Sequence, residues 1–200
     1  MAHGDGISNQ EELEDRLSRP PAGLVESFRL LEGDILILGA GGKMGPSLAR
    51  MAARAREASG VPRKITAVSS FSTPGLRERI ESSGVETIRK DLLEAGAFAA
   101  LPEAENVMYM VGRKFGSTGA EWQTWATNVY VAGLAGHRFK DSRVVAFSSG
   151  NVYPFVPAGG KGATETTPPG PVGEYAITCL GRERMFDYCA REWGGRVLHL

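Results

Sequence analysis

The chain has 200 residues, and its 23 lysines and arginines balance its 23 aspartates and glutamates, so the formal net charge is zero. This length predicts about one domain, and a hydrophobic share of 42% is enough for a buried core. The neutral balance excludes the strong positive field of a non-specific nucleic-acid binder, so we expect no nucleic-acid partner. No apolar stretch approaches the roughly 20 residues that span a bilayer, and residues 1–10 lack a secretory signal. We therefore expect no membrane partner and a cytoplasmic location.

The cysteines and histidines predict neither a disulfide nor a metal site. Cys179 and Cys189 are expected on one helix, where a rise of ~1.5 Å per residue separates them by roughly 15 Å. A disulfide requires Cα atoms within about 7 Å, so both should be free thiols, which is typical of a reducing compartment. His3, His137 and His199 are scattered and form no cluster with metal-ligand spacing.

Residues 1–32 predict an N-terminal helical extension. Ser8 and Glu11 fit a capping box at the start of the first helix. A proline pair ends that helix, and residues 22–31 predict a second, short one.

From residue 33 onward, short apolar strands alternate with helical segments. Strands are expected at 34–38, 64–69, 85–89, 106–111, 143–148 and 196–200, and helices at 46–58, 76–82, 120–137 and 175–192. This alternation predicts an α/β domain over residues 33–200, with a Rossmann-type doubly wound parallel sheet and helices on both faces.

One face of the expected helix at 120–137 is apolar. It carries Trp122, Trp125, Ala126, Val129, Ala132 and Gly133. The tryptophans are expected in the core or in a subunit interface. A homodimer through helices 120–137 and 175–192 is the quaternary structure that this pattern favours.

A glycine-rich loop joins the first strand to the following helix. Its candidate ligand-binding residues are Gly39, Gly42, Lys43, Met44 and Gly45. Small residues let the backbone approach a phosphate closely, and the helix N-terminus supplies donors and positive potential. An ATPase loop would need a hydroxyl residue after the lysine, and Met44 stands there. The strand, loop and helix together predict a dinucleotide site.

The second strand ends in Ser69 and Ser70, without the acidic residue that commonly binds the ribose of NAD. Serine hydroxyls could receive a 2′-phosphate, and Lys43, Arg77 or Arg79 could neutralise it. The expected cofactor is therefore NAD(P), with NADP slightly favoured.

These residues resemble the extended short-chain dehydrogenase/reductases, in their NAD-dependent epimerase/dehydratase branch. The matching motifs are Gly39-x-x-Gly42-x-x-Gly45, Asp91-Leu92, Val111-Gly112, Asn128, the run from Ser148 through Ser149 to Tyr153, and Tyr175. The resemblance implies that Asp91 and Leu92 hold the adenine, that Val111 and Gly112 lie beside the cofactor, and that Asn128 is structural. It implies Ser149 and Tyr175 as the catalytic serine and tyrosine.

The chain departs from the family pattern at one catalytic position. The family signature is Tyr-x-x-x-Lys, whereas this chain has Cys179 four residues after Tyr175. In the family, that lysine holds the nicotinamide ribose and lowers the tyrosine pKa through its charge. Lys114 could in principle replace the missing ammonium, but a solvated lysine is the expected state. The family's substrate-binding portion would follow Leu200, so we expect the sequence to be a fragment.

Two functions remain open at this stage. The first is an NAD(P)-dependent oxidoreductase, epimerase or dehydratase that acts on a sugar nucleotide or a similar hydroxyl or carbonyl compound. The alternative is a catalytically degenerate dinucleotide-binding module with a sensing, regulatory or structural role. The retained Ser149 and Tyr175 favour the enzyme, and Cys179 favours the module.

Overall fold

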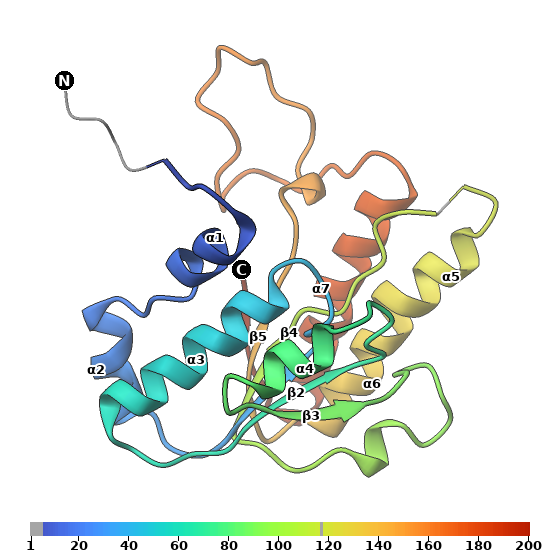
Figure 1. Cartoon of the computed structure of the whole chain (residues 1–200). Helices are drawn as coiled ribbons and strands as arrows, with labels where there is room; N and C mark the ends of the chain where they lie inside the picture. Colours follow the sequence, from blue (N-terminus) through green and yellow to red (C-terminus); the bar gives the residue numbers. More distant parts are fainter. Residues whose placement is uncertain (1–5, 117) are drawn as a thin grey trace. The chain divides into compact units, whose positions relative to one another are not determined.

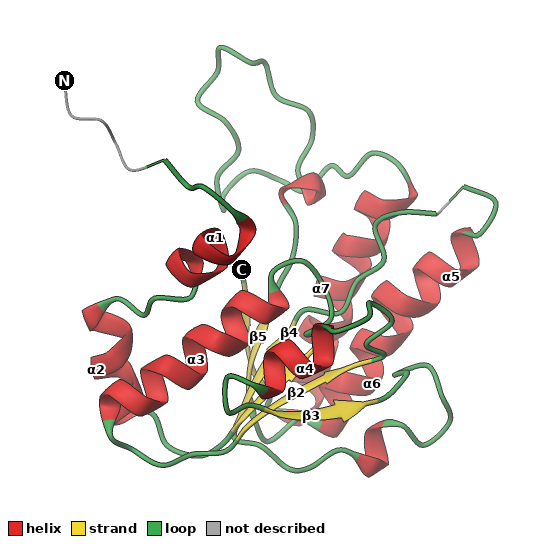
Figure 2. Ribbon diagram, viewed as in Figure 1, coloured by secondary structure: helices red, strands yellow, loops and turns green. Residues whose placement is uncertain are grey.

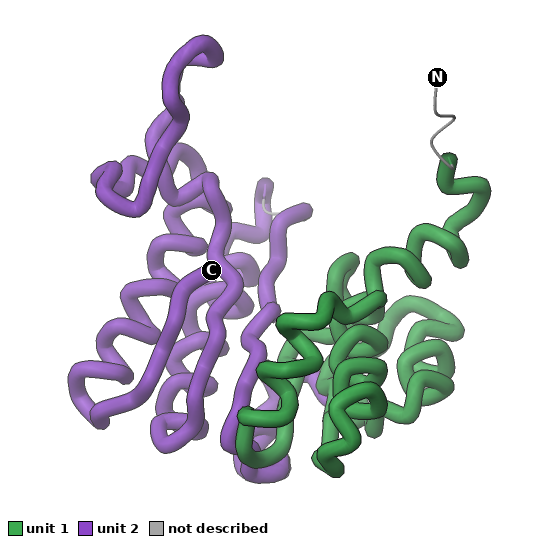
Figure 3. The backbone as a smooth tube through the Cα atoms, turned by 90° about the vertical axis from the view of Figure 1, so that its left-hand side faces the viewer, with its two compact units in different colours: residues 1–89 green, residues 90–200 purple. Residues whose placement is uncertain are grey.

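The computed structural model describes residues 6–116 and 118–200. His3, which was not expected to bind a metal, lies outside the described residues. The chain divides into two compact units, residues 1–89 and 90–200 (Figure 3). Each unit is an α/β unit with three parallel strands. Every strand expected from the sequence is present.

The first unit has the strand order β3-β2-β1. Its elements are α1 (Gln10–Leu17), α2 (Ala22–Leu30), β1 (Ile35–Leu38), α3 (Gly45–Ser59), β2 (Ile65–Ser69), α4 (Leu76–Glu81) and β3 (Glu86–Arg89). Ile35 pairs with Ile65 and Thr66 with Glu86. All four residues of β1 are buried, as expected for a strand of a parallel sheet that is covered on both faces.

The helical extension packs on α3, which contacts both α1 and α2 (Figure 1). The Arg54 guanidinium donates to the Asp15 carboxylate at 2.5 Å and to the Ser18 hydroxyl at 2.8 Å. Hydrogen bonds from Arg54 and Arg19 lower the pKa of Asp15 to about 2. Charge pairing and a buried serine therefore hold α1 in place.

The predicted capping box at the start of α1 is wrong. Asn9 is the N-cap, and its side-chain oxygen accepts a hydrogen bond from the Glu12 amide at 2.9 Å. Ser8 instead donates from its amide and hydroxyl to the Glu12 carboxylate. The acid that closes the turn thus lies one residue further along the chain than Glu11.

A buried arginine binds the carbonyl groups at the C-terminus of α2. Arg63 donates to the carbonyls of Phe28 at 2.5 Å and Leu31 at 2.7 Å, and its guanidinium lies 5.0 Å from the Phe28 ring centroid. The last carbonyls of a helix lack intrahelical partners and carry negative potential. Arg63 satisfies them and fixes the path of the chain into β1.

The second unit has the strand order β4-β5-β6. Its strands are β4 (Asn106–Tyr109), β5 (Arg143–Ala146) and β6 (Arg196–His199); its helices are α5 (Glu121–Trp125), α6 (Val131–Arg138) and α7 (Glu174–Trp193), with 3-10 turns at Phe98–Ala100 and Gly150–Val152. A long loop without helix or strand leads from the second 3-10 turn to α7 (Figure 2). Among the described residues, no helix is both long enough and apolar enough to cross a bilayer.

The single helix predicted over 120–137 is wrong in one respect: a π-helical turn over Ala126–Tyr130 separates α5 from α6. A π turn holds an extra residue, so it shifts the side chains that follow to a new face. Asn128 within the turn and Val131 after it face inward, as does Thr124 before it, whereas Trp122 is 69% exposed. The core position considered for Trp122 is therefore wrong.

The glycine loop of the first unit is built on close backbone contacts. Gly39 has φ +85° and donates to the Val68 carbonyl at 2.9 Å. A Cβ at Gly45 would lie 2.1 Å from the Ala40 carbonyl oxygen, whereas a Cβ at Gly42 would meet only the Gly39 carbonyl, at 3.5 Å. Gly45 is thus required for the close approach of α3 to β1, and Gly42 is not.

We expect Gly45→Ala to lower the free energy of unfolding by about 1–3 kcal/mol, because the added methyl group forces the backbone apart. Gly42→Ala is the matched control and should stay within about 0.5 kcal/mol of the wild type. Urea unfolding followed by circular dichroism measures both. Equal stability of the two variants would contradict the packing role of Gly45.

Candidate functional site

The first unit presents the glycine loop at the start of α3. No side chain caps α3 at Met44, and Pro46 occupies its first turn. Lys43 and Met44 are exposed. The free backbone donors and the positive end of this 15-residue helix suit an anionic group, and a Cβ at Gly42 would meet only the Gly39 carbonyl oxygen, at ordinary contact distance. The loop residues therefore fit the pyrophosphate of a dinucleotide.

Ser69 and Ser70 lie at the end of β2, as predicted. The Ser69 hydroxyl would be 2.3 Å from a Cβ at Gly41, so this side chain packs directly on the glycine loop. The Ser70 carbonyl accepts a hydrogen bond from Nε of Arg89 at 3.1 Å. Sequence reasoning missed Arg89, because it lies at the end of β3 and reaches Ser70 only through the pairing of the two strands.

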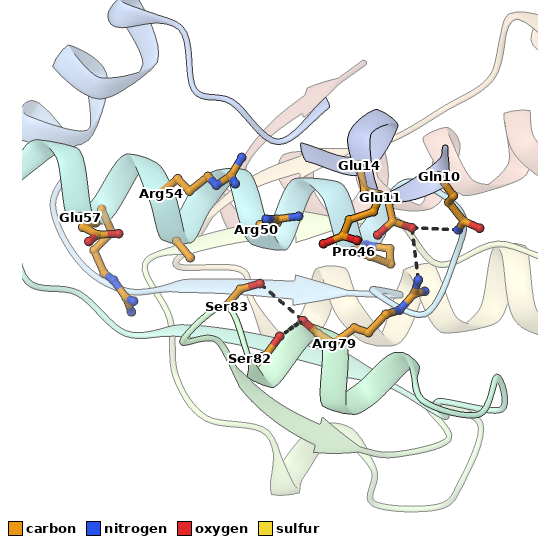
Figure 4. A pocket seen from close by; sticks show the side chains of 12 residues that line it. Gln10, Glu11, Glu14, Pro46, Arg50, Arg54, Glu57, Arg79, Ser82 and Ser83 are labelled. Atoms are coloured by element: carbon orange, nitrogen blue, oxygen red, sulfur yellow. Dashed lines mark hydrogen bonds and ion pairs between the residues drawn. The ribbon is translucent and has the colours of Figure 1, made fainter. Parts of the chain in front are cut away.

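Arg77 and Arg79, the two arginines that were candidates for binding a 2′-phosphate, both have carboxylate partners. Nε of Arg77 donates to Glu81 at 2.9 Å, and Arg79 pairs with Glu14 at 3.2 Å. Glu14 and Arg79 line a polar cavity of about 650 Å³ formed by α1, α3 and α4 and the turn after α4 (Figure 4). None of the predicted cofactor residues lines this cavity.

In the second unit, Asp91 and Leu92 stand directly after β3. The Asp91 carboxylate accepts a hydrogen bond from the Leu93 amide at 2.9 Å, which forms a tight turn. Asp91 is exposed and Leu92 is buried. The pair therefore presents a carboxylate to solvent on an anchored backbone.

Asn128 is fully buried in the π turn and joins two segments. Its oxygen accepts from the Arg113 amide at 2.7 Å, and its nitrogen donates to the Arg113 carbonyl at 3.1 Å and to the Thr178 hydroxyl at 2.9 Å. Val111 and Gly112 precede Arg113 in the loop after β4. Asn128 thus fixes this loop against α7.

The predicted catalytic residues of the second unit lie together. Tyr175 and Cys179 are on α7, and Ser149 precedes the 3-10 turn at Gly150–Val152. Cys179 and Ser149 both lie close enough to the Tyr175 phenol to act on its pKa. Cys179 is fully buried, one helical turn after Tyr175.

The surroundings of Tyr175 act on its pKa in opposite directions. Burial is the largest cause and raises the pKa, and the neighbouring Cys179 thiol also raises it. The hydrogen bond with Ser149 and the positive charge of Arg182 lower it, with a net rise. The phenol therefore stays protonated at neutral pH, so it can donate a proton to an oxygen but is a weak base.

Sequence reasoning missed three residues around this cluster. Thr178 bridges Asn128 and the Tyr175 carbonyl, Glu183 accepts a hydrogen bond from Ser148, and Arg182 donates to the Val111 carbonyl at 2.9 Å. Their positions three, seven and eight residues after Tyr175 put them near one face of the helix. This helical spacing is the sequence signal that could have identified the three residues.

Comparisons with known structures show the fold. A UDP-glucuronic acid 4-epimerase from Bacillus cereus, in complex with NAD and a fluorinated UDP-sugar, shares 18% identity at a TM-score of 0.70, over 83% of this chain and 55% of that one. A dTDP-glucose 4,6-dehydratase from Streptomyces venezuelae with bound NAD shares 21% identity at a TM-score of 0.72, over 83% and 54%. A short-chain dehydrogenase/reductase superfamily protein from Agrobacterium tumefaciens, also with NAD, shares 21% identity at a TM-score of 0.65, over 82% and 47%.

The chain thus spans about half the length of these solved structures. No curated protein matches it in sequence. The predicted fold class is confirmed: six parallel strands with flanking helices form a Rossmann-like α/β fold. The model of the NAD dependent epimerase/dehydratase family matches residues 35–200. The chain therefore belongs to the NAD-dependent epimerase/dehydratase family.

Proposed function

We propose that the chain is the dinucleotide-binding part of an NAD(P)-dependent oxidoreductase, epimerase or dehydratase that acts on a sugar nucleotide or a similar hydroxyl or carbonyl substrate. Family membership supports the class of reaction, and the neighbours crystallised with NAD and a UDP-sugar support the class of ligands. The observation that carries the proposal is that Ser149 lies close enough to the Tyr175 phenol to lower its pKa. Two oxygen-bearing side chains would face the reacting oxygen of the substrate.

The residues proposed for the cofactor differ between the two units. In the first unit, the pyrophosphate would lie on the glycine loop and the adenosine ribose at Ser69 and Ser70. In the second unit, the contributing residues would be Asp91, Leu92, Val111, Gly112, Asn128 and Tyr175. The nicotinamide supplies a hydride acceptor and donor when it is bound. Ser149 would orient the reacting oxygen, and Tyr175 would exchange its proton with it.

Cys179 favours the second candidate, a dinucleotide-binding module without turnover. A thiol beside Tyr175 raises the pKa of that phenol instead of lowering it, and a tyrosine of ordinary pKa is only about 0.1% phenolate at pH 7. The module would keep the glycine loop but would not use Tyr175 as a base.

We also propose a cytoplasmic location. Cys179 and Cys189 are both buried free thiols, which is typical of proteins in a reducing compartment. Fractionation of cells that produce the protein, with the chain detected in each fraction, would test this.

Hydride transfer separates the two functions. We expect the full-length protein that contains this chain to bind NADH or NADPH, detected by cofactor fluorescence, and to transfer deuterium from C4 of the reduced cofactor to a UDP- or dTDP-linked keto sugar. Tyr175→Phe should retain binding and lose the transfer, because it removes only the proton donor. Binding without transfer in the wild type would favour the module, and binding of neither cofactor would reject both functions.

Within this proposal, the cofactor preference is for NADP. Ser70 offers no negative charge at the end of β2, and the Arg89 guanidinium lies beside it. A charge-assisted bond from arginine to a phosphate would favour the 2′-phosphate.

We expect Arg89→Gln to weaken NADPH binding about tenfold, equivalent to about 1.4 kcal/mol, and to leave NADH binding unchanged. Arg77→Gln is the control, because Arg77 already pairs with Glu81. Fluorescence titration with both cofactors gives the four dissociation constants. Tighter binding of NADH than of NADPH by the wild type would overturn the preference.

The apolar surface of α5, α6 and α7 supports a homodimer. A groove of about 440 Å³ is lined by Trp125, Ala126, Val129, Tyr130, Gly133, Leu134, Met185, Tyr188, Cys189 and Trp193. Tyr130 and Tyr188 are more than half exposed, and a large contiguous apolar patch marks an interaction site. We propose that a second copy of the chain covers this groove.

We expect Tyr188→Glu to shift the protein from dimer to monomer in sedimentation velocity, because the interface would bury an unpaired carboxylate. Phe155→Glu is the control, because Phe155 is 88% exposed on the long loop and outside the groove. A monomeric wild type at high micromolar concentration would contradict the proposed dimer.

A further inference from the structure

One face of α7 carries the candidate catalytic residues of the second unit and, unexpectedly, a buried arginine. Tyr175, Thr178, Cys179 and Arg182 follow one another at helical spacing. Thr178 and Cys179 are fully buried, and Arg182 is 5% exposed. Arginine is almost never this deeply buried unless it is paired or has a specific role.

The surroundings of Arg182 leave its charge uncompensated. Nη1 donates to the Val111 carbonyl at 2.9 Å and would lie 3.1 Å from a Cβ at Gly112. Nε is buried without a hydrogen-bond partner, and within the described ranges no carboxylate forms an ion pair with this guanidinium. A full positive charge is therefore held under the loop after β4.

The direction of the side chain matters as much as its burial. Long side chains on a helix lean toward its N-terminus, over the preceding turn. Arg182 lies three residues after Cys179, so its side chain leans toward the level of Cys179 and Tyr175 on the same face. The lysine of the family signature would bring its ammonium to this face of the helix.

We propose that Arg182 is a positioning residue that supplies, from one turn further along α7, the positive charge that is missing at Cys179. This deepens the proposed function and rests on it, because the charge would serve Tyr175 as the proton-exchanging group.

The electrostatics of Tyr175 agree with this geometry. The positive charge of Arg182 lowers the Tyr175 pKa, against burial and Cys179, which raise it. The same charge also acts to lower the pKa of the buried Tyr109 phenol. A buried charge is poorly screened by salt, so its effect extends further than that of a surface charge.

The other charged groups near Tyr175 are partly or fully exposed, although Nε of Arg113 is buried without a hydrogen-bond partner. Nζ of Lys114 lies 5.9 Å from the centroid of the Tyr175 ring, on the loop after β4, but Lys114 is exposed. Arg113, next to it, donates to the Gly116 carbonyl. Glu174, at the start of α7, accepts a hydrogen bond from the Trp125 indole. Ser149 contributes a hydrogen bond and no charge.

The test is a pH titration of the Tyr175 phenol, followed by NMR of protein labelled with ¹³Cζ-tyrosine and assigned with Tyr175→Phe. Arg182→Gln keeps a donor for the Val111 carbonyl and removes the charge, and Arg182→Lys keeps the charge. We expect Gln to move the Tyr175 titration upward by roughly half a pH unit or more, and Lys to leave it near the wild type. The difference should persist in 0.5 M NaCl. Lys114→Met, the matched surface control, should produce a smaller shift that disappears in salt.

A second arm keeps the proposal falsifiable if Arg182→Gln disturbs folding. Cys179→Lys in the Arg182→Gln background returns a cation to the same face and should bring the Tyr175 titration back down. An unchanged titration in Arg182→Gln, or a Lys114→Met shift as large and as resistant to salt, would overturn the proposal. The titration needs neither cofactor nor substrate, so its result is independent of the binding and hydride-transfer assays that test the proposed function.

Discussion

The hydrogen bonds of Asn128 are the constraint on which the second unit, residues 90–200, depends. One fully buried amide binds both backbone groups of Arg113 and the hydroxyl of Thr178. It thereby fixes the loop after β4 to the helix that carries Tyr175. A buried amide left without these partners would cost about 1–3 kcal/mol for each unsatisfied group. The π turn that directs Asn128 inward is therefore part of the site.

Arg182 reaches the same loop from α7 itself. Its bond to the Val111 carbonyl lies two residues before the Arg113 backbone that Asn128 holds. The short loop is thus anchored by a neutral amide at one end and a cation at the other. The anchoring lets the protein keep a guanidinium in a largely apolar interior, because at least one of its donors is satisfied.

Local patterns in the sequence were sufficient for the parallel strands, the glycine loop and the spacing of Ser149, Tyr175 and Cys179, because each depends on residues close together in the chain. The predicted N-cap, Ser8, lies one residue before the observed N-cap, Asn9. Glu11 and Glu12 are adjacent acids, and either could have closed the first turn. Arg63 and Arg89 could not be predicted, because their partners lie on elements that only the tertiary fold brings near. The π turn has no recognisable local signal, and it changes which of the residues after it face the core. The candidate site was therefore predictable as a set of residues but not as an electrostatic environment.

Replacement of the signature lysine separates two tasks that one side chain performs in the family. A lysine ammonium both contacts the nicotinamide ribose and lowers the tyrosine pKa. A guanidinium that is 5% exposed and bound to a backbone carbonyl can act through space on the phenol, because a field does not require contact. It cannot also present its donors to a ribose hydroxyl without leaving its buried position. If Arg182 acts as proposed, cysteine at position 179 would remove a cofactor contact but only part of the electrostatic effect on Tyr175, so that cofactor affinity and acid–base strength would vary separately in this chain.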